Sequence, residues 1–178
     1  ACDDVSGTTT ISSDCSSDFD ITGSNADITL SAEAAANVNN LLDNKGTNSS
    51  LTITTSGSLK SSGGDYVIRN SYTGKSFDLI SNAGTISGVL RAIYTTRPLT
   101  TLINSGTISA SNSQTIYLSS YAITTFTNSG TISSANGNTL LLYEEITTLN
   151  NTGTITVTSD NTAVDINIAT DGMSGQEG

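Results

Sequence analysis

The chain lacks histidine and tryptophan, has one proline (Pro98), and carries only 6 basic residues against 16 acidic ones. Without histidine, a Ser-His-Asp triad and a histidine-bound metal site are excluded within this segment. A nucleic-acid groove needs a stripe of Lys and Arg, so we expect no nucleic-acid partner, and the same deficit disfavours adsorption to anionic membranes. The basic residues are Lys45, Lys60, Arg69, Lys75, Arg91 and Arg97.

Long apolar runs and cysteines are also scarce. No stretch comes near the roughly 18 apolar residues that a transmembrane helix needs. Cys2 and Cys15 are the only cysteines, and both lie close to the start. We predict that they form a disulfide, which indicates an oxidising compartment. The opening residues ACDD are typical of a mature terminus left after removal of a signal peptide.

Ser and Thr are abundant instead: they make up roughly a third of the chain, far more than in an ordinary globular domain. Thr, Ile, Val and Tyr favour strands, whereas the plentiful Asn and Gly favour turns. Charged residues are too sparse for a disordered acidic chain, which stays unfolded through self-repulsion. The composition therefore predicts an all-β protein with many tight corners.

One motif occurs three times, as LTTLINSGTIS at 99–109, ITTFTNSGTIS at 123–133 and ITTLNNTGTIT at 146–156. Alignment of the chain on the glycine of this motif gives spacings of 27, 22, 24 and 23 residues, a period that suits one turn of a solenoid. The aligned glycines are Gly57, Gly84, Gly106, Gly130 and Gly153. Four residues before them stand the apolar residues Ile53, Ile80, Leu102, Phe126 and Leu149.

Apolar residues alternate around each corner with a period of two, which indicates strands rather than helices. A third strand is expected after each corner, at 66–68, 92–94, 116–118, 140–143 and 163–168. Stacked turns would pair each strand with its copies about 4.8 Å above and below. We therefore predict a right-handed parallel β-helix with three short strands and about 22–24 residues per turn, since parallel crossovers are almost always right-handed.

The repeated asparagine and glycine are predicted to build the corner between the first and second strands. The glycine is expected to need a positive φ angle, which it adopts without steric cost. The asparagine two residues earlier is expected to point inward and to hydrogen-bond the asparagine of the next turn. The residues of this structural ladder are Asn82, Asn104, Asn128 and Asn151 with Gly84, Gly106, Gly130 and Gly153.

Residues 1–42 are expected to form an N-terminal cap, because a β-helix exposes its core and strand edges at each end. Within this cap, Ser31–Leu42 has an N-cap serine and apolar Ala34, Val38 and Leu41 at helical spacing, which predicts a short helix. A degenerate β turn is the alternative for this segment. Residues 43–178 are assigned to β-helix turns that we expect to belong to a longer solenoid.

The repeat [LI]TT[LF]xN[ST]GTI[ST] resembles repeats in bacterial autotransporter passenger domains, the secreted part of type V secretion proteins. The likeness covers residues 51–168 and is strongest over 77–156. Among these passengers, the chain is most similar to the adhesin and aggregation type. The resemblance implies a right-handed parallel β-helix on the Gram-negative cell surface, exported through the periplasm and tethered by a C-terminal membrane β-barrel that lies outside this sequence.

Four tyrosines fall in the third-strand region of successive turns, and three arginines lie near them in the sequence. If they stack on one flank, these side chains form a patch for a partner protein or a sugar. Alternatively, the tyrosines shield strand edges and fill gaps between turns. The residues are Tyr66, Tyr94, Tyr117, Tyr143, Arg69, Arg91 and Arg97.

The leading functional hypothesis is an adhesin that binds a protein or glycan on a host or neighbouring cell, or that self-associates and clumps cells. The alternatives are a secreted β-helix polysaccharide lyase or glycoside hydrolase, and the stalk of an autotransporter toxin. No carboxylate pair recurs at the repeat spacing, and the adjacent Glu144 and Glu145 are expected on opposite faces of a strand. We therefore expect no catalytic activity, no cofactor and no metal.

Overall fold

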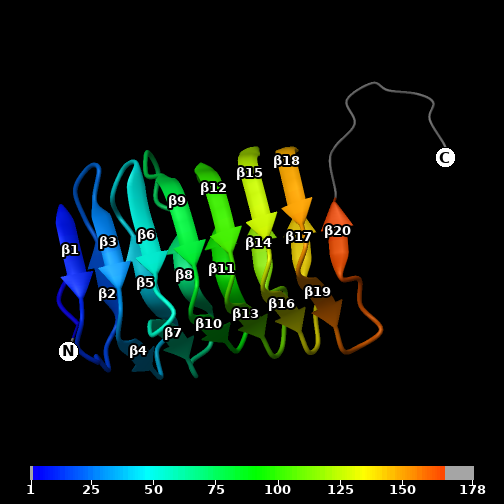
Figure 1. Ribbon diagram of the computed structural model, residues 1–178, viewed down its shortest axis with the longest axis horizontal. Helices are drawn as coiled ribbons and strands as arrows, with labels where there is room; N and C mark the ends of the chain where they lie inside the picture. Colours follow the sequence, from blue (N-terminus) through cyan, green and yellow to red (C-terminus); the bar gives the residue numbers. More distant parts are fainter. Residues whose placement is uncertain (1, 167–178) are drawn as a thin grey trace.

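The computed structural model describes residues 2–166, and in this range the chain is all-β with no helix. The strands form three parallel sheets of seven, six and seven strands. From β3 onward each turn of the chain, called a coil below, supplies one strand to each sheet. Figure 1 shows the coils stacked along one long axis. The predicted parallel β-helix with three strands per turn is confirmed.

The first sheet contains β1 (Thr8–Ile11), β3 (Asp27–Leu30), β6 (Ser49–Ile53), β9 (Phe77–Asn82), β12 (Leu99–Asn104), β15 (Ile123–Asn128) and β18 (Ile146–Asn151). The second contains β4 (Glu33–Ala36), β7 (Ser58–Ser61), β10 (Thr85–Gly88), β13 (Thr107–Ala110), β16 (Thr131–Ser134) and β19 (Thr154–Val157). The third contains β2 (Phe19–Ile21), β5 (Asn40–Asn44), β8 (Tyr66–Asn70), β11 (Arg91–Thr95), β14 (Ile116–Leu118), β17 (Leu140–Leu142) and β20 (Val164–Ile166). The strand expected at 163–168 is therefore β20, and residues 167 and 168 lie outside the described range.

The coils wind in the predicted right-handed sense. With the chain running from left to right in Figure 1, the strands of the first sheet descend in front, the second sheet crosses below, and the third sheet rises behind. Equivalent positions of the first sheet pair in register at spacings of 22, 24 and 23 residues, through Ile80, Leu102, Phe126 and Leu149. The expected length of a turn is confirmed for these coils.

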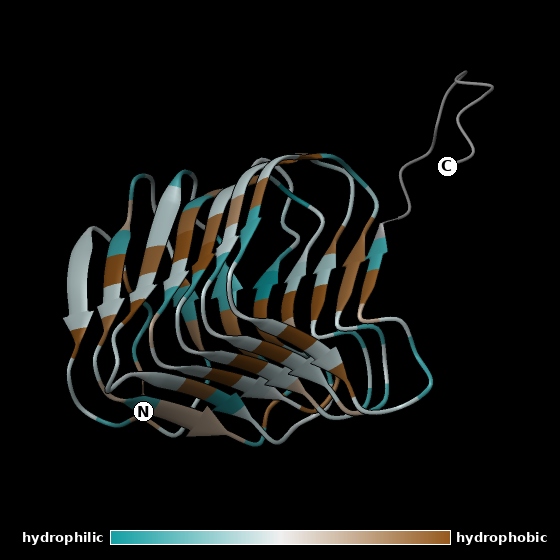
Figure 2. Ribbon diagram, turned by 45° about the vertical axis from the view of Figure 1, so that its right-hand side comes forward, coloured by the Kyte–Doolittle hydropathy of each residue, from teal (hydrophilic) through white to brown (hydrophobic). Residues whose placement is uncertain are grey.

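The core consists of columns of apolar side chains that point inward at the same place in successive coils. Figure 2 shows the resulting apolar bands, which recur at matching heights on neighbouring strands. Burying one such side chain contributes roughly 1.5–3 kcal/mol, which a coil gains only when others stack on it. The fully buried columns are Ile80, Leu102 and Phe126 in the first sheet, Ile86, Ile108 and Ile132 in the second, and Ile68, Ile93, Ile116 and Leu140 in the third.

The helix predicted for Ser31–Leu42 is wrong, and the alternative of a β turn is correct. This segment holds β4 and the start of β5, and its Ala34 and Leu41 are fully buried in two different sheets. Ala34 pairs with Leu59 of the next coil. Stacking against that coil outweighs the weak local preference for a helix. The sheets therefore begin well before residue 43.

Aligning the sequence on the corner glycines placed β6 two residues out of register with β9. Ile80 pairs with Leu51 rather than with Ile53, and Ile53 pairs with Asn82. In the second sheet Ile86 still pairs with Leu59, so the corner after β6 is longer than the corner after β9. Alignment on the corner glycine could not reveal this insertion, because both corners contain a glycine.

The corner glycines are required for a different reason from the one predicted. Positive φ angles occur at Gly7, Gly23 and Gly74 among the described glycines, and not at the corner glycines. Instead, a Cβ at Gly106 would lie 2.1 Å from the backbone oxygen of Gly84 in the preceding coil. That oxygen accepts a hydrogen bond from the Thr107 amide. Glycine therefore permits the close stacking of corner backbones.

The predicted asparagine ladder is confirmed. The Nδ2 group of Asn82 donates to Oδ1 of Asn104 at 2.8 Å, and the same bond links Asn104 to Asn128 and Asn128 to Asn151, each at 2.8 Å. Each Nδ2 group also donates to the backbone oxygen of the glycine two residues later. These bonds satisfy amide groups that would be costly to bury without partners, and only Oδ1 of Asn82, at the start of the ladder, has no partner in the described chain.

A second polar ladder, which the sequence analysis missed, occupies the corner between the third and first sheets. Asn44 donates to Asn70, and Asn70 donates to the hydroxyl of Thr95 at 3.0 Å. All three side chains are buried. The only signal in the sequence was a polar residue at the end of three successive third strands, which resembles an ordinary turn residue. The two ladders overlap only in the coil of β9 and β11, which contains both Asn82 and Thr95; the second ladder joins this coil to the two before it, and the asparagine ladder joins it to those after it.

Candidate functional site

The outward face of the third sheet carries most of the tyrosines and arginines selected from the sequence. Because successive residues of a strand point to opposite faces, the residues between the core positions reach the surface. Tyr66 pairs in register with Arg91 of the next coil. Beside this pair one column runs along the whole sheet, through Asp20, Asp43, Arg69, Tyr94, Tyr117, Leu141 and Asp165.

The four selected tyrosines form one row, called the tyrosine stack below. The ring centroids of Tyr66 and Tyr94 are 4.3 Å apart and those of Tyr94 and Tyr117 are 5.2 Å apart, with planes inclined by 14° and 23°. Tyr143 lies 5.6 Å from Tyr117, is tilted by 55° and is 37% exposed. The inner rings therefore cover one another's faces, whereas Tyr143 keeps part of its ring face open.

Arg91 lies across the tyrosine stack. Its guanidinium carbon is 5.7 Å from the ring centroid of Tyr66, 5.6 Å from that of Tyr94 and 5.1 Å from that of Tyr117. Cation–π attraction at such distances contributes about 0.5–2 kcal/mol, depending on solvation. The Nε group of Arg91 donates to Oε1 of Gln114 at 3.1 Å, a contact that sequence analysis missed. Three rings and one hydrogen bond thus hold the guanidinium in place.

Arg69 is already occupied by partners within the chain. Its Nε group donates to Asp43 at 2.6 Å, a terminal N–H group bonds the other oxygen of the same carboxylate, and a further bond of 2.7 Å reaches the Tyr72 hydroxyl. The Asp43 side chain is 13% exposed. The hydrogen bond and charge of Asp43 raise the pKa of Arg69. Arg69 therefore joins two coils and has little capacity for a ligand.

Arg97 lies beyond the end of β11, in the loop that leads to the first sheet. Its Nε group donates to the backbone oxygen of Ser71 at 3.3 Å, and a terminal N–H group donates to Thr73 at 3.2 Å. These bonds fasten the loop of one coil to that of the next. Arg97 is therefore separate from the tyrosine stack, although sequence proximity placed it there.

Tyr94 titrates differently from an ordinary tyrosine. Its burial within the stack raises the pKa of its hydroxyl above the usual 10.0, and the neighbouring Tyr66 and Tyr117 raise it further. The cations Arg91 and Arg69 oppose this shift but do not cancel it. The hydroxyl of Tyr94 is therefore protonated at neutral pH and can donate a hydrogen bond.

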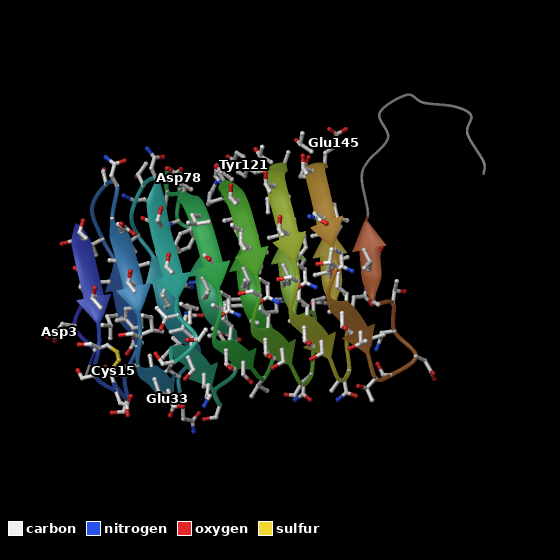
Figure 3. The ribbon with its side chains drawn as sticks, viewed as in Figure 1. Asp3, Cys15, Glu33, Asp78, Tyr121 and Glu145 are labelled. Atoms are coloured by element: carbon white, nitrogen blue, oxygen red, sulfur yellow. A yellow bond between two sulfur atoms is a disulfide. The ribbon has the colours of Figure 1, made fainter. Side chains whose placement is uncertain are left out.

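The N-terminal end is closed by a disulfide and by two aspartates. Cys2 and Cys15 are bonded as predicted, with Cα atoms 5.2 Å apart, and Figure 3 shows Cys15 near Asp3 at this end. Asp4 accepts a hydrogen bond from the Asp20 amide at 3.0 Å, and Asp14 accepts one from the Glu33 amide at 2.9 Å. Carboxylates thus satisfy backbone donors of the first strands.

The other acidic residues do not gather into a site. Glu144 and Glu145 lie in the loop between β17 and β18, not on a strand as expected, and both are exposed. In Figure 3 Glu145 lies on the same edge of the solenoid as Asp78 and Tyr121. Among residues 2–166 there is no group of three or more potential metal ligands. The same range contains no helix able to span a membrane.

Comparison of the chain with protein-family models, with curated proteins and with solved structures gave no significant match. The likeness to autotransporter passengers therefore remains a resemblance of repeat motifs. The described chain is a three-sheet β-solenoid with polar ladders at two of its corners. The most organised surface feature described above is the tyrosine stack with Arg91.

Proposed function

We propose that the chain is the adhesive segment of a surface-exposed protein of the autotransporter passenger type, acting through the long faces of its solenoid. The observation that carries this proposal is the pair of hydroxyl columns on the outward face of the second sheet. They keep strict register over four coils. The columns are Thr85, Thr107, Thr131 and Thr154, and beside them Ser87, Ser109, Ser133 and Thr156.

Such columns favour adhesion because they are uncharged, regularly spaced and rich in donors and acceptors. Each hydrogen bond contributes only about 0.5–1.5 kcal/mol. Within each column the hydroxyls repeat about every 4.8 Å along the axis, so a partner with extended structure can bond many hydroxyls at once. Many solenoids displayed on one cell would add avidity to these weak contacts. The partner is a protein or glycan on a host cell, or another cell that carries the same protein.

The proposed location is the surface of a Gram-negative bacterium, reached through the periplasm. Two features support it: the repeat resembles secreted passengers, and the Cys2–Cys15 disulfide is compatible with an oxidising compartment. The supporting experiment uses cells that produce the full-length gene product. Antibody against residues 2–166 should label intact cells, and those cells should clump or bind host cells and matrix.

The adhesive face can be identified by adding charge. In the full-length protein, Thr107→Glu with Thr131→Glu places two carboxylates on the second sheet, and Thr101→Glu with Thr125→Glu does so on the first sheet. We expect one of these pairs to disperse the cells or abolish attachment, while Thr107→Ser with Thr131→Ser leaves both unchanged. If clumping and attachment survive both charged pairs while surface labelling stays normal, the proposed function is wrong.

A further inference from the structure

Half of the six basic residues form ion pairs within the described residues; Lys75, Arg91 and Arg97 do not, and of these only Arg91 lies in a strand. Three ion pairs occur within the described residues, and each joins a basic side chain to a carboxylate of the preceding coil: Lys45 with Asp20, Lys60 with Glu33, and Arg69 with Asp43. The residue that precedes Arg91 in register is Tyr66. No carboxylate of residues 2–166 forms an ion pair with Arg91. A half-buried guanidinium is thus kept without a counter-ion in a chain of 16 acidic residues.

Arg91 also has donors to spare. A guanidinium has five N–H donors, and within the described chain only Nε of Arg91 makes a hydrogen bond. The two terminal nitrogens form the fork that binds a carboxylate through two parallel hydrogen bonds. Because the three rings and Gln114 already orient the side chain, an anion would bind with little loss of conformational entropy.

We propose that Arg91 and the tyrosine stack form a binding site for a carboxylate-bearing oligosaccharide. The carboxylate of one sugar binds the terminal nitrogens of Arg91. Tyr94 and Tyr117, whose ring centroids lie 5.6 and 5.1 Å from the guanidinium carbon, supply the phenol hydroxyls that bond sugar hydroxyls. The open ring face of Tyr143 receives a second sugar, since it is tilted and 37% exposed.

The spacing of the site selects a ligand of several rings. Arg91 and Tyr143 are two coils apart, because β11 pairs with β14 and β14 with β17. Two strand spacings amount to roughly 10 Å along the axis. A single carboxylate ion can reach Arg91 but not Tyr143, whereas a short oligosaccharide lying along the solenoid touches both.

A peptide fits this face less well than a saccharide. Peptides commonly bind β proteins by adding a strand at a free sheet edge. The tyrosine stack lies within the third sheet, where β11 is paired on one side with β8 and on the other with β14. Nucleic acid is disfavoured because it needs a stripe of basic residues, whereas on this face Arg69 is paired with Asp43 and the same outward column ends in Asp165.

This inference deepens the proposed adhesive function by naming a receptor class, and it is tested separately on the purified full chain. The probes are a galacturonate tetramer and a tetramer alternating glucuronate with N-acetylglucosamine, titrated by calorimetry at low salt. The fully methyl-esterified galacturonate tetramer is the matched uncharged ligand, and acetate is the free carboxylate. We expect at least one acidic tetramer to bind at least tenfold more tightly than either the ester or acetate.

The variants assign the binding to Arg91. Arg91→Gln should weaken tetramer binding at least tenfold, and Arg91→Lys, which keeps the charge but not the fork, at least threefold. Tyr143→Ala should weaken binding of the tetramer but not of acetate, and Arg97→Gln, outside the stack, should change nothing. Circular dichroism of each variant verifies that it is folded. If Arg91→Gln does not fold, the weaker binding expected of Arg91→Lys tests the role of Arg91 instead.

Several results would overturn the proposal. It fails if neither acidic tetramer binds, if the ester binds as tightly as the acid, or if Arg97→Gln weakens binding as much as the Arg91 variants. Tighter binding of an acidic peptide with four carboxylates, lost in Arg91→Gln, would assign the site to peptides instead. None of these results alters the cell-clumping test of the second sheet, so the two proposals can fail independently.

Discussion

The first asparagine of the ladder, Asn82, stacks on an aliphatic residue, whereas the next, Asn104, stacks on an asparagine. Replacing these two asparagines should therefore cost different amounts of stability. Coil by coil, the inward residue at this corner changes from aliphatic to amide in the order Ile11, Leu30, Ile53, Asn82, Asn104, Asn128 and Asn151. Oδ1 of Asn82 faces Ile53 and is buried without a hydrogen-bond partner in the described chain. We therefore predict that Asn82→Leu and Asn104→Leu differ in cost, although both asparagines are fully buried.

The magnitudes follow from the bonds that each change removes. Asn104→Leu takes the ladder donor away from Oδ1 of Asn128, and an orphaned buried acceptor costs about 1–3 kcal/mol. It also removes the bond from Asn82, worth about 1 kcal/mol. Asn82→Leu loses one ladder bond but only moves the unpartnered oxygen from Asn82 to Asn104. Its leucine also continues the column of Ile53, so the expected cost is about 0–1 kcal/mol.

The measurement is urea unfolding of the purified chain followed by far-ultraviolet circular dichroism. We expect Asn104→Leu to lower the free energy of unfolding by about 2–4 kcal/mol, several times more than Asn82→Leu. Thr131→Ser, at an exposed position beside the corner, is the control and should change the free energy by less than about 0.5 kcal/mol. Equal losses for the two asparagines, or a larger loss for Asn82→Leu, would refute the reasoning about orphaned amide oxygens.

Two further predictions concern the corner backbone and the tyrosine stack. Gly106→Ala should lower the free energy of unfolding by about 2–4 kcal/mol, because its Cβ would meet backbone atoms of the preceding coil. Gly64→Ala is the control and should lower it by less than about 1 kcal/mol, because there a Cβ would meet only the side-chain oxygen of Asn39, at 3.3 Å. Equal melting temperatures for these two alanine variants would contradict the close-stacking account. Because the pKa of Tyr94 is raised, the folded state binds its proton more tightly than the unfolded state, so this contribution to stability is fully present below pH 10.0 and is lost as pH rises from 10.0 through the higher pKa of the folded state. Tyr94→Phe should make this fall shallower, as urea midpoints measured on either side of pH 10.0 will show; an unchanged slope would rule out the raised pKa.

Much of the fold could be predicted because a solenoid turns a sequence period directly into spatial contacts. Residues such as Leu102 and Phe126 recur at one period, and stacking brings them together whatever the detailed shape of the coil. The same logic predicted the asparagine ladder and the row of tyrosines, since equal positions in successive coils must be neighbours. The disulfide was also predictable, because only two cysteines are present.

The errors arose where local pattern and stacking disagree. Ala34 and Leu41 have helical spacing, but each is buried more effectively against the next coil, so strands form. The corner glycine was explained by its own φ angle, but the real constraint is the backbone of another coil. The extra residues after β6 were invisible because alignment on a shared glycine hides an insertion beside it.

The sequence by itself determined the strand class, the period of the coils and the identity of the stacked columns, because these depend only on residue type and spacing. Tertiary structure decided what each stacked residue actually meets. Arg69 and Arg91 occupy similar places in the sequence pattern, but register places Asp43 beside the first and Tyr66 beside the second. Asp43 therefore neutralises Arg69, whereas Arg91 keeps free donors. The physical reason is that an outward side chain in a solenoid contacts whichever residue lies in register with it on the neighbouring coil, and this register is a property of the tertiary structure.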